Sequence, residues 1–140
     1  GNVLVLSIST DDGAVPPQFY SEADLLVTPI YEDRTLSLEY DRVYPDRTEE
    51  TLDGDIDTGG IVGGENFDRF EEVVELIKNF DYEEGSAENI GGSSLVVDLE
   101  FVNGDHRRFE VDWNNESEGL EEIRSFYLDL SNMLTEEVPV

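Results

Sequence analysis

Residues 53–57 (DGDID) have the residue types and the spacing that begin a calcium-binding loop. Asp53, Asp55 and Asp57 match the first three ligand positions of an EF-hand loop, where carboxylates supply oxygen ligands. The sixth position, which needs glycine for a sharp turn, is Thr58, and no helical pattern precedes the run. We therefore interpret the run as an acidic strand end, and we keep Asp53, Asp55 and Asp57 as a candidate cation site of another kind.

The glycine-rich run at residues 59–64 (GGIVGG) precedes a predicted helix, where backbone N–H groups can bind a phosphate. The run lacks both the Gly-x-Gly-x-x-Gly spacing and the lysine and serine of a Walker motif. The neighbouring carboxylates of Asp57 and Glu65 would also repel an anion. We expect a flexible connection or close backbone packing here, and no cofactor site.

His106, Arg107 and Arg108 stand together beside a predicted hairpin turn. A catalytic histidine needs a nucleophile and an orienting acid, and no sequence signal supplies them. With one histidine and no cysteine in the chain, zinc and copper sites are poorly supported. We expect His106 at the surface and the two arginines paired with nearby acids. If the chain contacts an anionic group, Arg107, Arg108 and Trp113 are the candidate binding residues.

Carboxylate pairs can hydrolyse glycosides when two of them share a cleft and their pKa values are separated. The chain has 35 aspartates and glutamates, so close pairs are common by chance and their spacing selects none of them. The sequence therefore predicts no catalytic residue and a non-enzymatic protein, with a carboxylate-dependent hydrolase as an alternative.

The charge of the chain is its most extreme property. It carries 35 acidic residues and 8 basic residues, a formal net charge of -27 on 140 residues, with Lys78 as its single lysine. A folded chain of this size exposes roughly 7,000 Å², so neighbouring uncompensated charges lie about 16 Å apart. The Debye length is about 30 Å at 0.01 M salt and about 3 Å at 1 M. The compact state therefore repels itself in dilute buffer and is screened in molar salt.

Broad acidity with almost no lysine resembles the proteins of halophiles that accumulate salt in the cytoplasm, especially haloarchaea. The resemblance is one of composition over the whole chain. It implies a fold that needs high-salt counterions. It also implies a location in the cytoplasm of a salt-accumulating halophile, or on a virion or cell surface in brine.

The same acidity has a second interpretation, an inhibitor that mimics DNA and occupies a nucleic-acid-binding protein. Mimicry needs a dense row of charge, because duplex DNA carries one charge per about 1.7 Å of axis. The acids are spread evenly along this chain, which argues against mimicry unless folding aligns them. Direct contact with nucleic acid is disfavoured by charge, and no apolar run approaches the roughly 18 residues of a membrane span.

We therefore predict a protein that works by contact with a protein partner or as a homo-oligomer. It would be an accessory subunit or a structural component of a cell-surface or viral assembly.

Hydrophobic periodicity predicts six strands and two helices that position these residues. Apolar residues on both sides of the first strand predict burial on two faces, and Pro29 predicts an edge or a strand end. The predicted strands cover residues 3–9, 23–31, 35–44, 51–57, 95–102 and 106–113. The last two form a hairpin with a three-residue loop at residues 103–105, which sets Leu99 opposite Phe109 and Glu100 opposite Arg108.

The first helix is predicted to begin at an Asn66 cap and to end near Phe80. The second is predicted to follow a capping box of Asn115 and Glu118. The element order ββββ-α-ββ-α predicts the α+β class, an antiparallel sheet of about six strands with two amphipathic helices on one face. We expect a single domain over residues 1–140, with a frayed tail at residues 135–140.

Overall fold

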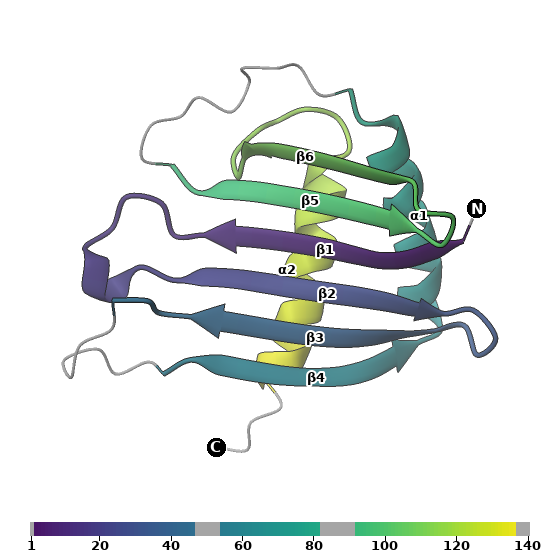
Figure 1. Ribbon diagram of the computed structural model, residues 1–140, viewed down its shortest axis with the longest axis horizontal. Coiled ribbons are helices and arrows are strands. Elements are labelled where there is room, and N and C mark those ends of the chain that lie inside the picture. The colour runs from purple at the N-terminus through teal and green to yellow at the C-terminus, as the bar shows by residue number, and fades with distance from the viewer. Residues whose placement is uncertain (1, 47–53, 82–91, 137–140) are drawn as a thin grey trace.

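The computed structural model describes residues 2–46, 54–81 and 92–136, which form a six-stranded sheet and two α-helices (Figure 1). This is the predicted α+β class, with the predicted element order. In chain order the elements are β1 (Val3–Asp11), the short helix η1 (Pro17–Phe19), β2 (Glu22–Ile30), β3 (Thr35–Val43), β4 (Ile56–Gly63), α1 (Glu65–Asn79), β5 (Ser94–Phe101), β6 (His106–Asp112) and α2 (Leu120–Glu136).

The strands lie in the order β4-β3-β2-β1-β5-β6, and every neighbouring pair is antiparallel. The first four strands follow one another across the sheet, and the β5–β6 hairpin joins the free side of β1. Both helices cross the strands on the same face, and the other face is left open toward the viewer in Figure 1. We call these the helix face and the open face of the sheet.

Alternation along the strands fills the helix face with apolar side chains, because successive residues of a strand point to opposite sides. Both helices are amphipathic, as predicted: the buried residues include Phe67, Phe70 and Ile77 in α1 and Leu120, Ile123 and Phe126 in α2. The fully buried side chains with the largest volumes are Phe67, Phe70, Phe126, Leu6, Ile8, Leu25, Leu36, Leu38, Ile77, Leu95, Leu99 and Leu120. Strands and helices thus share one continuous core.

The first strand is not buried on two faces as predicted, because both helices lie on the helix face and Val5 and Ser7 on the other face are only half-buried. A β-bulge also changes the alternation at its start. The pairing of β1 with β5 shifts between Val3 and Val5, so Val3 turns into the core and Leu4 is 47% exposed. Pro29 lies one residue before the end of β2, as predicted for a residue that cannot donate to a ladder.

The prediction for the fourth strand is wrong in its position. We placed the strand at residues 51–57 and a break at residues 59–64, whereas β4 covers Ile56–Gly63. A Cβ on Gly59 would lie 2.7 Å from the backbone oxygen of Leu38, so glycine allows β3 and β4 to approach closely. Residues 51–53 of the predicted strand lie outside the described residues.

Both predicted helix caps are also wrong. Helix α1 begins at Glu65, directly after Gly64, whose φ of 61° suits glycine, and no side chain caps this end. Asn115 accepts a hydrogen bond from the N–H of Ser117 in a turn, and α2 begins after Gly119 with φ of 92°. The chain thus enters each helix through a glycine with positive φ, which replaces the expected polar cap.

The β5–β6 hairpin forms, but its register differs from the prediction by two residues. Phe109 lies opposite Val97 instead of Leu99, and Arg108 lies opposite Asp98 instead of Glu100. Because the shift is even, every side chain keeps its predicted face.

Turn geometry explains the shift. The loop has three residues, as expected, but it covers residues 102–104 and is closed by a hydrogen bond from Phe101 N to Asp105 O at 2.8 Å. Its third residue is Gly104, with φ of 95°, and three-residue loops favour glycine at this left-handed position.

Helix α2 runs to Glu136, one residue beyond the point where we expected fraying to begin. Residues 137–140, the rest of the predicted frayed tail, lie outside the described part of the chain. The prediction of a single domain stays a prediction.

Candidate functional site

The open face of the sheet is the candidate functional site, because it gathers acidic side chains from every strand and no helix covers it. The alternation that buries leucines and valines on the helix face directs the intervening residues to the open face. The acids in these positions are Asp11, Glu22, Asp24, Glu39, Asp41, Asp57, Asp98, Glu100, Glu110 and Asp112. Among the lysines and arginines that the structure describes, Arg108 alone extends from this face.

Three aspartates form a row across neighbouring strands of the open face. Asp24 pairs in register with Asp41, and Asp41 pairs with Asp57. Neighbouring strands lie about 4.8 Å apart, so the row is much denser in charge than the surface average. Burial, a hydrogen bond with Asp57 and the charges of Asp57, Glu39 and Asp24 raise the pKa of Asp41.

Hydroxyl groups and one histidine satisfy some of the remaining carboxylates. Ser94 donates a hydrogen bond to Asp11 at 2.7 Å, and His106 lies 3.1 Å from Asp98. A shallow depression of about 180 Å³ on this face is lined by the carboxylates of Asp11, Glu22, Asp24 and Glu110, but by neither Asp41 nor Asp57. The depression is smaller than the roughly 300–1,000 Å³ of ordinary ligand pockets, so the face is better suited to attracting cationic groups than to enclosing a substrate for paired acidic catalysis.

The three predicted binding residues are not brought together. Arg107 faces the helices, where its Nε donates to the carbonyl of Ile77 at 2.7 Å and its Nη2 donates to that of Phe80. It therefore caps the C-terminus of α1, instead of pairing with an acid as we expected. Arg108 extends from the opposite face of the sheet, and Trp113 is partly buried with its ring edge against Tyr127 at 5.9 Å.

The candidate cation residues are dispersed as well. Asp53 lies outside the described residues, Asp55 accepts a hydrogen bond from the N–H of Tyr44 at 3.0 Å, and Asp57 belongs to the aspartate row. Within residues 2–46, 54–81 and 92–136 no group of three or more ligand-type side chains is arranged to hold a metal ion. His106 is exposed beside the turn, as predicted.

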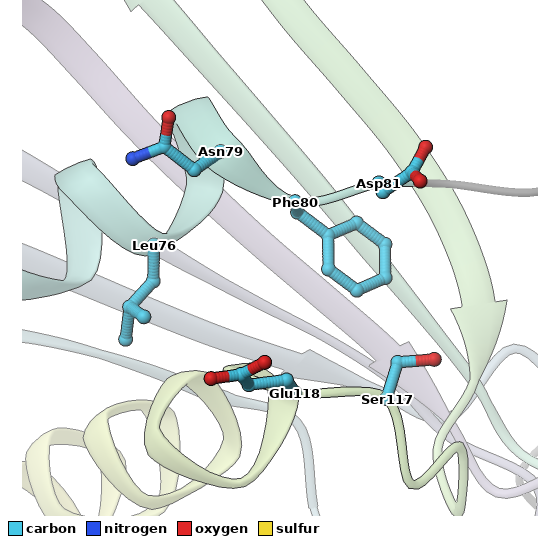
Figure 2. Close-up of a pocket in the computed structure, with 6 residues that line it drawn as sticks. All are labelled: Leu76, Asn79, Phe80, Asp81, Ser117 and Glu118. Atoms are coloured by element: carbon cyan, nitrogen blue, oxygen red, sulfur yellow. The ribbon is translucent and has the colours of Figure 1, made fainter.

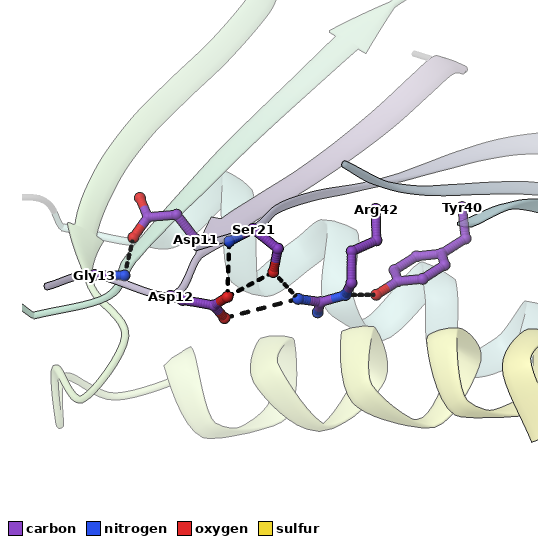
Figure 3. A network of polar contacts seen from close by, with 6 residues as sticks. All are labelled: Asp11, Asp12, Gly13, Ser21, Tyr40 and Arg42. Atoms are coloured by element: carbon purple, nitrogen blue, oxygen red, sulfur yellow. Dashed lines mark hydrogen bonds and ion pairs between the residues drawn. The ribbon is translucent and has the colours of Figure 1, made fainter. Parts of the chain in front are cut away.

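A polar network that no local sequence motif indicates lies at one end of the helix face and joins Asp12, Ser21, Tyr40 and Arg42 (Figure 3). Asp12 accepts hydrogen bonds from the N–H and the Oγ of Ser21, at 2.8 and 2.6 Å. The guanidinium of Arg42 reaches Ser21 and Asp12, and its Nε donates to the hydroxyl of Tyr40 at 3.1 Å.

This network ties the β1–β2 connection to β3. Burial disfavours the charge of Arg42, but the hydrogen bond to Tyr40 and the nearby charges outweigh it, so the pKa of Arg42 is raised. The inward alternation of Leu36, Leu38 and Tyr40 continues to Arg42, which is the signal that could have located it. Ser21 is fully buried, so its hydroxyl, although it is hydrogen-bonded to the carboxylate of Asp12, is out of reach of a substrate, and we assign the network a structural role.

The pocket drawn in Figure 2 lies between the end of α1 and the start of α2. It has a volume of about 490 Å³ and is lined by Leu76, Asn79, Phe80, Asp81, Ser117 and Glu118. Its charged groups are two carboxylates, and Figure 2 shows the side chains of Phe80 and Leu76 between the two helices. This mixture offers no constellation for catalysis or for binding an anion.

No protein-family model matches the chain, and no curated protein or solved structure is similar enough to count as a match. None of the helices in the described part of the chain has the length and apolar character needed to cross a membrane.

Proposed function

We propose that this chain is a non-enzymatic, salt-adapted protein that acts through protein–protein contact, with the open face of its sheet as the contact surface. The observation that carries the proposal is a six-stranded sheet face that no helix covers and to which every strand contributes an acid. An antiparallel sheet can leave one face in water, so this face is available for contact with another protein.

The size of the open face supports this use. Strands of about nine residues rise about 3.3 Å per residue, and six strands lie about 4.8 Å apart, which gives an area of roughly 700 Å². A stable protein–protein contact buries about 600–1,000 Å² on each partner. The open face therefore suffices for one standard interface. Its carboxylates favour a partner surface rich in arginine and lysine.

The acids outside the open face support salt adaptation as the origin of the net charge. Helix α1 carries Glu65, Asp68, Glu71, Glu72 and Glu75 on its outer side, so the acidic surface extends over both sides of the molecule. A charge that served one ligand alone would be concentrated on one side. The protein would accordingly work in the cytoplasm of a salt-accumulating halophile or on a surface in brine.

A second candidate, a DNA-mimicking inhibitor, is favoured by one specific observation. The row of Asp24, Asp41 and Asp57 aligns charges about 4.8 Å apart, although the acids are evenly spread along the sequence. A DNA mimic would displace DNA from a nucleic-acid-binding protein and would fold without molar salt. The carboxylate-dependent hydrolase is less favoured, because the depression that holds Asp11, Glu22, Asp24 and Glu110 is shallow and small.

Matched variants test the contact surface. We compare a double variant of the open face, Glu39→Gln with Glu110→Gln, and a double variant of the helix side, Glu72→Gln with Glu121→Gln. All four glutamates are exposed, and both variants change the net charge equally. Each tagged chain is used to recover partners from cells grown in molar salt. We expect the open-face variant to lose a partner that the wild type and the helix-side variant both retain. Equal recovery by both variants would contradict the proposal.

A further inference from the structure

Strand β4 is an unprotected edge of the sheet. Among the described residues it pairs with β3 on one side only, and its other side ends the sheet. Exposed edges usually carry charges, prolines or bulges that prevent pairing with other chains. The opposite edge strand β6 follows this rule with His106, Arg107, Arg108, Glu110 and Asp112. In β4, Asp57 is the single charged residue among eight, and Ile61 is 68% exposed.

A groove runs beside this edge. It has a volume of about 560 Å³, and it is lined by residues 58–62 of β4 and by Met133, Leu134 and Glu136 at the end of α2. Met133 is 41% exposed, and a Cβ on Gly60 would lie 3.2 Å from Leu134, so the helix end lies directly against the strand. An added strand would therefore gain backbone hydrogen bonds on one side and apolar contact with α2 on the other.

We infer that β4 pairs with an extended strand of the protein partner, in which basic side chains alternate with apolar ones. This inference rests on the proposed function, because it assigns a binding mode to the same partner. On the open face the added strand would lie beside Asp57 of β4, with Asp41 and Glu39 one strand further away on β3, and these carboxylates favour lysine and arginine at that end of the strand. On the helix face it would lie next to Val62 and Met133, which favour apolar residues.

The same charges disfavour a second copy of this chain in that position. Two β4 edges would bring two equally acidic sheets together, and each copy carries a net charge of -27. A basic partner strand relieves this repulsion, whereas self-pairing increases it. Strand addition of this kind takes its affinity from main-chain hydrogen bonds and its specificity from alternate side chains.

The probe is a synthetic peptide of alternating valine and lysine, matched to β4 in length. Two derivatives carry N-methyl groups on alternate amides, one on the valine amides and one on the lysine amides. Binding to the full chain is measured by fluorescence anisotropy in molar potassium chloride, which suppresses unspecific charge attraction. Because one set of amides faces β4, we expect one derivative to bind at least about tenfold more weakly than the other. Equal affinities of the two derivatives would overturn the inference.

Two variants on α2 test the groove. Met133 and Leu128 are 41% and 42% exposed on the same helix, and Met133 lines the groove while Leu128 does not. We expect Met133→Gln to weaken peptide binding severalfold and Leu128→Gln to leave it unchanged. Equal effects would contradict a strand seated against α2.

Sedimentation of the full chain tests the alternative that a second copy of this chain occupies the β4 edge. A dimer that the peptide dissociates would assign β4 to a second copy and overturn the basic partner strand. The contact proposed for the open face is tested separately by the Glu39→Gln and Glu110→Gln variant. Failure of the edge pairing is therefore distinguishable from failure of the proposed function.

Discussion

Arg107 and Arg108 are neighbours in the sequence, and strand geometry gives them opposite surroundings. Arg107 points to the helix face and satisfies two carbonyls at the end of α1, where a positive charge is also favoured by the helix dipole. Arg108 extends from the open face among carboxylates. The pair that looked like one basic patch therefore consists of a structural residue and a surface residue.

This difference predicts unequal effects of the same substitution. Arg107→Met leaves the carbonyls of Ile77 and Phe80 without their charged donor, so we expect it to lower the free energy of unfolding by about 1–3 kcal/mol. The control Arg108→Met, on the exposed side, should change it by less than about 0.5 kcal/mol. Urea unfolding in constant molar potassium chloride measures both. Similar values for the two variants would contradict the capping role of Arg107.

Asp41 predicts a pH dependence of stability. Its pKa in the folded state is raised above the ordinary value of 3.8, so the folded state binds this proton more tightly than the unfolded state. Protonation of Asp41 therefore stabilises the fold fully at pH values below the ordinary pKa of the unfolded state. This stabilisation is lost as the pH rises through the raised pKa of the folded state. We expect Asp41→Asn to be more stable than the wild type at neutral pH and to lose less stability between pH 4 and neutrality.

Unfolding in urea at a series of pH values, at fixed salt, measures this effect. The control is Glu72→Gln, which removes one exposed carboxylate from α1 and faces no aspartate row. If Glu72→Gln flattened the pH dependence as much as Asp41→Asn, the row of Asp24, Asp41 and Asp57 would not be its cause.

At the scale of the elements, most of the fold was predictable from the sequence. Period-two and helical patterns located five of the strands and both helices, because burial of one side of each element imposes those periods. The fourth strand was misplaced because its glycines look like a break, while here they permit close backbone contact. The hairpin register was missed because the positive φ of Gly104 outweighs hydrophobic matching across the strands.

We expect replacement of two glycines of β4 by alanine to destabilise the fold by different amounts, because the added methyl group meets different neighbours. In Gly59→Ala the new Cβ would lie 2.7 Å from a backbone oxygen of Leu38, whereas in Gly60→Ala it would lie 3.2 Å from the flexible end of Leu134. We expect Gly59→Ala to destabilise the fold by about 1–3 kcal/mol and Gly60→Ala to cost less. Urea unfolding measures the free energy of unfolding of both variants. A loss for Gly59→Ala that is equal to or smaller than the loss for Gly60→Ala would contradict the close packing of β3 against β4.

The candidate site was less predictable than the fold. Its acids are ordinary strand residues, and nothing in their spacing along the chain indicates that Asp24, Asp41 and Asp57 become neighbours. That row depends on strand order and register, which come from the packed sheet. The Arg42 network likewise joins residues from the β1–β2 connection and β3 that no local motif links.

At the scale of the whole molecule, charge density decides the conditions in which the fold persists. The surface area is 8547 Å² and the net charge is -27, which places uncompensated charges about 18 Å apart. This spacing is shorter than the Debye length of about 30 Å at 0.01 M salt and far longer than about 3 Å at 1 M. We therefore expect repulsion across the whole surface to oppose folding in dilute buffer and to be screened in brine.

Thermal melting across a potassium chloride series tests this claim most directly. We expect the Tm to rise by about 10 °C or more from millimolar to molar salt, which is about 2–3 kcal/mol for a chain of this size. A variant with Glu39→Gln, Glu72→Gln, Glu110→Gln and Glu121→Gln should show a smaller rise, because it carries less repulsion. A Tm that stays constant over the series would contradict salt adaptation and leave the acidic row to be explained by a specific target.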